Sequence, residues 1–166
     1  MTADPHPLFL NLAIASLMVG LTVCVHLAGL TSLIALMRRT APRLKVHDSV
    51  MGQALLILGV VFGIFAVHSV EIWMYALLYE LLGSFRTFEE ALYFSTVAFT
   101  TVGFGDLVLP EKWRLVSVLE AVNGMLLIGW STAFLVSVTG QLRLLESEIE
   151  EELEEREEAR SRRRAR

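Results

Sequence analysis

The sequence predicts an all-α membrane protein with three transmembrane helices and one short re-entrant helix that is followed by a loop. Three observations lead to this fold class. First, 54% of the 166 residues are hydrophobic and the mean hydropathy is positive, which is more apolar than an ordinary soluble domain. Second, the charged residues gather in short blocks that separate long apolar runs. Third, one further apolar run is too short to cross a bilayer.

Each of the three long apolar runs passes the length test for a transmembrane helix. The first, residues 8–37, contains no acidic or basic residue apart from His26, and its 30 positions would form a helix of about 45 Å. A second helix is expected over residues 50–72 and a third over residues 113–140. The remaining segments are polar connections or termini.

Basic residues indicate how the chain is oriented. The connection after the first helix carries four basic side chains, whereas the segment before that helix has none. By the positive-inside rule we expect the connection in the cytoplasm, the N-terminus outside and the C-terminus in the cytoplasm of a multi-pass plasma membrane protein. Residues 1–49 would supply the N-terminal helix and this connection, residues 50–140 a second unit, and residues 141–166 a charged cytoplasmic helical tail.

The short apolar run is expected to form a helix over residues 87–99 that enters the membrane and stops. Its apolar part would be only roughly 18 Å long. Thr87 followed by Glu90 matches a capping box, and Glu89 and Glu90 suit the positive end of the helix dipole. Before this helix, residues 73–86 should form an outer turn whose aromatic rings lie at the membrane surface: Trp73, Tyr75 and Tyr79.

The segment that follows the short helix, residues 100–106, reads TTVGFGD. Irregular backbone at membrane depth is tolerated only where protein covers it or where it lines a water-filled path, so we expect this segment to line a pore. Gly103 and Gly105 can adopt left-handed backbone angles at little steric cost. Both the string and its position between a short helix and a long one resemble the signature of potassium channels.

The resemblance is to the potassium channel pore-loop family, in its two-span form with an extra N-terminal helix, and it covers residues 91–133. It implies a homotetramer that conducts K⁺ passively, with backbone carbonyls replacing the hydration shell of the ion. Residues 50–140 would be the pore domain. Its parts would be the outer helix (50–72), the outer turret (73–86), the pore helix (87–99), the filter (100–106) and the inner helix (113–140). The implied ion-binding residues are Thr101, Val102, Gly103, Phe104 and Gly105, with potassium at the first four and with Thr100 and Asp106 as filter support.

The same resemblance implies roles on the inner helix. Gly124 matches a glycine that permits bending, although close helix packing is the alternative for a small residue. Residues at helical spacing beyond it would line the inner cavity: Met125, Ile128, Thr132 and Val136. Val97 stands where some members have a glutamate paired with the aspartate after the filter, so Asp106 is expected to lack that partner. Phe104 replaces the more common tyrosine, and no ladder of arginines indicates a voltage sensor.

Ionisable residues inside the predicted spans suggest one polar cluster. His68 and Glu71 share a helix face, and Glu120 lies near the same end of the third span. The cluster could sense pH, or it could be a structural hydrogen-bond clasp between the helices. A metal site is a third interpretation, but no fourth ligand is evident. His26 is expected to be a packed histidine, and Asn123 to form hydrogen bonds between helices.

Other functional classes fit the sequence less well. A nonselective cation channel and a pore-loop subunit of a potassium transporter remain alternatives, and a membrane-anchored scaffold would leave the glycine-bearing loop unexplained. No HExxH, GxSxG or nucleotide-binding loop indicates an enzyme, and no cofactor is expected beyond K⁺ ions in the filter. The expected partners are membrane lipid, potassium ions and identical subunits, with no nucleic acid. The sequence indicates neither the gating stimulus nor a cytoplasmic partner of the tail.

Overall fold

The computed structural model describes the backbone of residues 5–43 and 50–164 and the side chains of residues 8–43 and 51–140. The described part of the chain contains helices and no strand, so the predicted all-α class is confirmed. The elements are α1 (Pro5–Thr40), α2 (Val50–Leu81), α3 (Phe88–Phe99), a short 3₁₀ helix η1 (Glu111–Trp113) and α4 (Arg114–Arg164). Three segments are long and apolar enough to cross a membrane, as expected: Leu8–Thr40, Met51–Leu81 and Glu111–Gly140.

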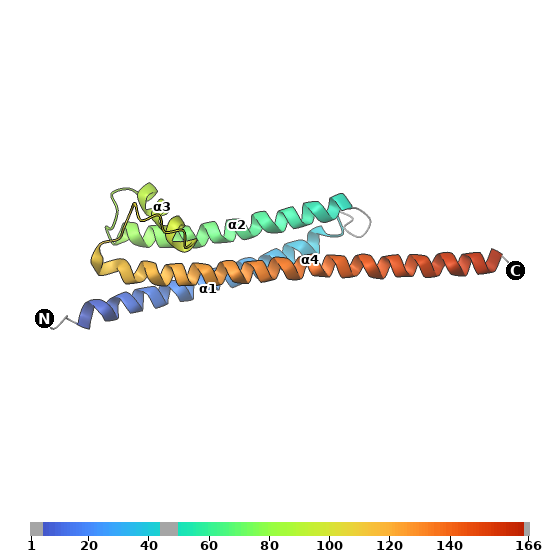
Figure 1. Ribbon diagram of the computed structural model, residues 1–166, viewed down its shortest axis with the longest axis horizontal. Helices are drawn as coiled ribbons and strands as arrows, with labels where there is room; N and C mark the ends of the chain where they lie inside the picture. Colours follow the sequence, from blue (N-terminus) through green and yellow to red (C-terminus); the bar gives the residue numbers. More distant parts are fainter. Residues whose placement is uncertain (1–4, 44–49, 165–166) are drawn as a thin grey trace.

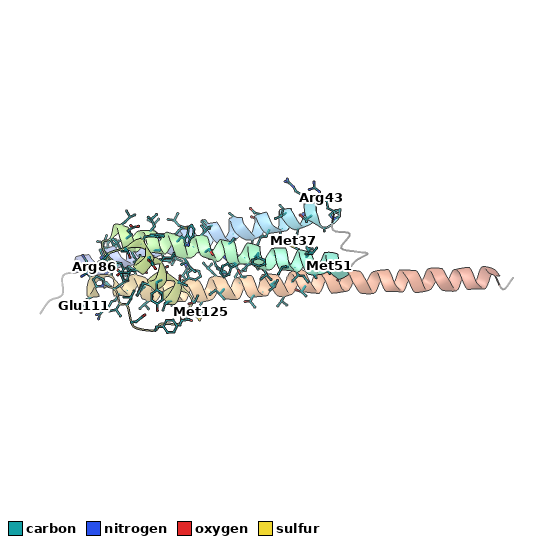
Figure 2. The ribbon with its side chains drawn as sticks, turned by 90° about the horizontal axis from the view of Figure 1, so that it is seen from above. Met37, Arg43, Met51, Arg86, Glu111 and Met125 are labelled. Carbon is teal, nitrogen blue, oxygen red and sulfur yellow. The ribbon has the colours of Figure 1, made fainter. Side chains whose placement is uncertain are left out.

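The three long helices lie alongside one another, and α1 contacts both α2 and α4 (Figure 1). Helix α3 packs on α2 and α4 at the end where α1 begins, while α4 projects far beyond the other helices at the opposite end. Figure 2 shows Arg86 and Glu111 at the first end and Arg43 and Met51 nearer the second. The loop around α3 therefore lies at the opposite end of the bundle from the last residues of α1 and the first residues of α2.

Helix α2 is longer than the sequence predicted, and this overturns the expected turret. It continues to Leu81 because no helix breaker occurs before Gly83, whose φ is +62°. The aromatic residues assigned to the membrane surface therefore lie on the helix. Trp73 is 57% exposed, but Tyr75 and Tyr79 are fully buried. The ring of Tyr79 packs edge-on against Phe94 of α3, so α3 covers the surface that was expected to meet the headgroups.

The start of α3 agrees with the expected cap. Thr87 has an extended backbone, and its hydroxyl accepts a hydrogen bond from the amide of Glu90 at 3.2 Å. The Glu90 carboxylate accepts in turn from the amide of Arg86 at 3.0 Å, one residue earlier than in the standard capping box. These bonds satisfy amides that the helix cannot pair internally, so the entry point of α3 is well defined.

Glycines allow α1 and α2 to approach closely. A methyl group at Gly29 of α1 would overlap Val67 of α2, and one at Gly63 of α2 would overlap Leu33 of α1. Each helix thus inserts a branched side chain against a glycine of the other, which is typical of helix pairs in membranes. This packing fixes α1 against the rest of the chain.

The expected tail is helical, since α4 continues without a break to Arg164. The side chains of residues 141–166, including the apolar positions expected to form a short bundle, lie outside the described residues. Lys45 of the basic connection also lies outside the described residues, because the described part before α2 ends at Arg43.

Candidate functional site

The segment of interest begins in the cap that ends α3. The amide of Thr101 donates to the carbonyl of Ala98 at 2.9 Å, and the amide of Val102 donates to the carbonyl of Val97 at 3.1 Å. These two bonds, with Thr101 at a φ of +61°, form a Schellman motif. Glycine usually occupies that left-handed position, and a threonine there costs roughly 1–2 kcal/mol. The backbone that leaves α3 is thus held in a strained conformation by the end of the helix.

Left-handed backbone recurs along the segment. Gly103 has a φ of +59° and Gly105 a φ of +76°, while Thr101 is the only non-glycine residue with a positive φ in the described chain. Residues with positive and negative φ therefore alternate from position 101 to position 105. The sequence singled out both glycines for this conformation, and the structure confirms that they adopt it. Nothing lies within 4 Å of a methyl group built at either glycine, so the backbone angle is what requires glycine there.

Side chains of the segment turn toward α3. Val102 and Phe104 line a groove of about 410 Å³ together with residues of that helix, including Leu92 and Thr96. Both side chains remain largely exposed in the single chain, at 53% and 69%. Both side chains therefore lie beside α3, and one chain does not fill the space beside them.

Asp106 has a hydrogen-bond donor that the sequence analysis missed. The hydroxyl of Tyr93 donates to Asp106 Oδ2 at 2.7 Å, and the amide of Leu107 donates to Oδ1 at 3.0 Å. The bond from Tyr93 is the main cause that lowers the pKa of Asp106 below its ordinary value. Asp106 lacks a partner at Val97, as expected, and Tyr93, one helical turn earlier, supplies a hydrogen bond instead.

The inner helix meets the end of α3 at Gly124. A methyl group on Gly124 would overlap the backbone carbonyl of Phe99, so α4 can lie this close to α3 only with glycine there. Close packing, the alternative to a hinge, is thus what the structure shows at this position. The four predicted cavity-lining residues all lie on parts of α4 that the single chain leaves exposed: Met125, Ile128, Thr132 and Val136.

The expected single polar cluster is in fact two separate clusters. Glu120 is fully buried and bonds the hydroxyls of Tyr79, at 2.5 Å, and Ser95, at 2.6 Å. It has no hydrogen bond to His68 or Glu71, so the predicted grouping of the three is wrong. The reason is that Tyr79 of α2 and Ser95 of α3 each bond one of the two carboxylate oxygens of Glu120. Glu120 instead joins α2, α3 and α4, as a structural clasp would.

Glu71 forms the second cluster, with one histidine from each of two helices. Its Oε1 lies 2.9 Å from His26 Nδ1, and its Oε2 lies 2.8 Å from His68 Nδ1. His26 was expected only to pack, but it is fully buried and contacts the carboxylate directly. The signal that could have identified it is its isolation, since His26 is the one ionisable residue in a long apolar run.

Asn123 bonds across helices, as predicted. Its amide donates to Thr22 Oγ1 of α1 at 2.8 Å and to the hydroxyl of Tyr75 of α2 at 3.3 Å. The side-chain amide of Asn11, also on α1, donates a hydrogen bond to the carbonyl of Lys112 at 2.6 Å. The first helix is therefore attached to α4 and to η1 by hydrogen bonds as well as by apolar packing.

Comparison with known proteins gives one match. The model of a family described as an ion channel matches residues 54–141, slightly more than half of the chain. The matched range contains most of α2, all of α3, the segment 100–106 and the first half of α4. It excludes α1. No curated protein and no solved structure matches the chain.

Proposed function

The chain belongs to the ion channel family whose model matches residues 54–141, and from this premise we propose that it is a potassium-selective channel built from four identical subunits. In this proposal residues 101–105 are the selectivity filter, with potassium at Thr101, Val102, Gly103 and Phe104. Thr100 and Asp106 support the filter. The conduction is passive and needs no cofactor.

The observation that carries the proposal is the alternating sign of φ along the backbone from Thr101 to Gly105. In a regular strand all residues have the same hand, and successive carbonyls point to opposite sides. Reversing the hand at every second residue would turn successive carbonyls toward one side. A row of carbonyl oxygens on one side of a strand is the arrangement that can replace the water shell of a potassium ion.

The position of α3 supports the same function. Its C-terminal end leads directly into the segment through the Schellman motif at Thr101. The carbonyl end of a helix carries a partial negative charge, which favours a cation near it. A cation that reaches the inner end of the filter would thus meet a favourable potential.

A tetramer follows from what one chain leaves open. One strand cannot surround an ion, and the chain has one such segment. The side chains of Val102 and Phe104 and the groove beside α3 are exposed in the single chain, which suits contact with a neighbouring subunit. Fourfold cyclic symmetry would bring four copies of the segment to one axis. The exposed α4 residues Met125, Ile128, Thr132 and Val136 would then line the inner cavity.

The orientation proposed from the basic connection fits this arrangement. The end of the bundle that carries α3 would face outside, and the C-terminal end of α4 would lie in the cytoplasm. Bending of α4 near Gly124 would open and close the pore at the cytoplasmic end. Because Gly124 packs against Phe99, such a bend would have to begin on the cytoplasmic side of that contact.

Flux into liposomes tests the function. The purified chain, reconstituted at one protein concentration, should pass potassium down its gradient, discriminate strongly against sodium and be blocked by barium. Gly103→Ala is the matched control, because a side chain at a φ of +59° strains the proposed filter without altering the helices. Equal sodium and potassium flux would favour a nonselective cation channel, and flux that requires a second substrate or ion gradient would favour a transporter subunit.

A further inference from the structure

Three metal-binding side chains that are not part of the proposed filter converge between α1 and α2. His26, His68 and Glu71 each offer one ligand atom, and these atoms all lie within 4.8 Å of one another. Within the residues that the structure describes, this is the one such group of three. His26 and Glu71 are fully buried, and the side chain of His68 is 15% exposed.

The geometry points to a site for a transition metal ion of the zinc class, and we propose that His26, His68 and Glu71 bind one such ion per chain. Two imidazoles and one carboxylate are a donor set that zinc uses in sites with an open fourth position. Calcium and magnesium prefer oxygen donors alone, so two nitrogen donors select against them. The partial exposure of His68 leaves a route for the ion and for a water molecule as the fourth ligand.

The placement of the ligands on the helices suits this role. His68 and Glu71 are three residues apart on α2, so they lie on one helix face, and His26 reaches the same point from α1. Metal sites in helical bundles are built in this way, from side chains of facing helices with a pair at a spacing of three. The close approach of α1 and α2 at Gly29 brings the two helices near enough.

The separations of the ligand atoms can be compared with those around a bound ion. The Glu71 oxygens lie 2.9 Å and 2.8 Å from the Nδ1 atoms of His26 and His68, as in hydrogen bonds. Ligand atoms around a tetrahedral zinc ion, with bonds of about 2.0–2.1 Å, lie about 3.3 Å apart. An ion that enters the cluster would replace the hydrogen atoms between the ligands and widen these two separations by about half an ångström. It would also draw inward the ligand atoms that lie up to 4.8 Å apart, and side-chain rotation can supply both changes.

A residue outside the ligand set supports the assignment. The second ring nitrogen of His26, Nε2, lies 3.4 Å from the hydroxyl oxygen of Ser131 on α4. When Nδ1 binds a metal, the ring carries its proton on Nε2, and a hydrogen-bond acceptor there fixes the orientation of the ligand. Ser131 is buried and is placed to accept that bond. The ring of Trp130 lies 5.3 Å from that of His26 and covers it.

The site would join the extra helix to the channel domain. His26 lies on α1, outside the matched residues 54–141, whereas His68 and Glu71 lie within them. An ion bound by all three would connect α1 to α2 through coordinate bonds. It would also add positive charge where Glu71 otherwise places a carboxylate inside the membrane span, which is costly without compensation.

Metal binding to the purified full-length chain tests the proposal without any measurement of conduction. After treatment with a chelator, the chain is titrated with Zn²⁺ by calorimetry and with Co²⁺ by visible absorption. We expect one ion per chain, intense Co²⁺ bands typical of a four- or five-coordinate site, and a rise in melting temperature with Zn²⁺. His26→Ala, His68→Ala and Glu71→Gln should each abolish binding, and Ser131→Ala should weaken it by roughly 10–100-fold.

Two controls separate this site from adventitious binding. The double variant His6→Ala/His47→Ala removes the remaining histidines of the sequence, and Glu120→Gln changes the other buried carboxyl. Both should bind Zn²⁺ as the original chain does. Loss of binding in the histidine control, or retained binding in Glu71→Gln, would overturn the proposal. If a ligand variant fails to fold, the Cu²⁺ electron paramagnetic resonance spectrum of the original chain still decides, since absence of two coupled nitrogens would also overturn it.

Discussion

Gly124 of α4 packs directly against the backbone carbonyl of Phe99, the last residue of α3. Because Phe99 is followed at once by the cap that begins the proposed filter, this contact links α4 to the proposed ion pathway. The carbonyl cannot move aside as a flexible side chain could. The contact therefore makes the position of α4 sensitive to the size of one residue.

Gly124→Ala should destabilise the chain by about 1–3 kcal/mol, because the added methyl group overpacks a rigid contact. The measurement is the free energy of unfolding in detergent. Gly20→Ala is the matched control, since nothing lies within 4 Å of a methyl group at Gly20 and alanine favours a helix by up to about 1 kcal/mol. Equal stability of the two variants would show that the Phe99 contact does not constrain α4.

Tyr93→Phe should raise the pKa of Asp106 toward its ordinary value, since the tyrosine hydroxyl bonds the charged carboxylate and lowers that pKa. The sign follows from linkage. A carboxyl whose pKa is lower in the folded chain stabilises the fold at pH values above its ordinary pKa, and this stabilisation is lost as the pH falls through the pKa of the folded chain. The variant should thus lose the charge of Asp106 at a higher pH than the original chain. Carbon NMR of the labelled carboxyl measures this, and an identical titration in both proteins would contradict it.

The same change can be followed in ion flux. If the charge of Asp106 supports the filter, the acid side of the flux curve should move to higher pH in Tyr93→Phe. An Asp106→Asn background supplies the control, because Tyr93→Phe should cause no further displacement of that acid side once the titrating carboxyl is gone. A displacement that persists in this background would show that Tyr93 affects flux by a route other than the charge of Asp106.

Glu120→Ala should cost about 1–3 kcal/mol, because it leaves the buried hydroxyl of Tyr79 unpaired, whereas the hydroxyl of Ser95 keeps its hydrogen bond to the carbonyl of Ile72. Glu120→Gln keeps the shape and an acceptor, so its loss of stability should be smaller. Glu80→Ala is the control, because Glu80 is exposed on α2 and such changes are usually within about 0.5 kcal/mol. Thermal unfolding compares the three variants. Equal melting temperatures of Glu120→Ala and Glu80→Ala would show that Glu120 does not act as a structural clasp.

Glu120→Gln also tests whether this carboxyl senses pH. A structural clasp predicts that the variant keeps the pH response of conduction between about pH 5 and 8. A response that disappears in Glu120→Gln would instead assign the sensor to Glu120.

Deletion of the residues after Gln141 should leave potassium selectivity intact. The proposed filter lies between α3 and α4, and its described contacts are all to residues before position 141. The reversal potential of the truncated chain in mixed potassium and sodium measures this. A truncated chain that still conducts but no longer prefers potassium would contradict the separation of filter and tail.

The local features of the fold were accessible from the sequence. Hydropathy defined the three spans, the Thr87 cap defined the start of α3, and the glycines at 103 and 105 indicated left-handed backbone. Each of these depends on neighbouring residues alone. The left-handed Thr101 was missed because its conformation comes from the hydrogen bonds that end α3, and a threonine gives no sign of it.

The contacts between distant residues were not accessible. Helical spacing placed His68 and Glu71 on one face. It could not show that His26 of α1 bonds Glu71, or that Ser95 and Tyr79 form hydrogen bonds with Glu120. That choice depends on how the helices pack. The burial of Tyr79 has the same origin, because the position of α3 against α2 decides whether its ring meets lipid or protein.

The reversal potential of single channels with potassium on one side and sodium on the other tests the central claim most directly. The alternating backbone from Thr101 to Gly105 predicts a reversal far toward the potassium equilibrium potential. Gly103→Ala should lose that preference or the current. A reversal potential near zero in the original chain would contradict a potassium filter at these residues.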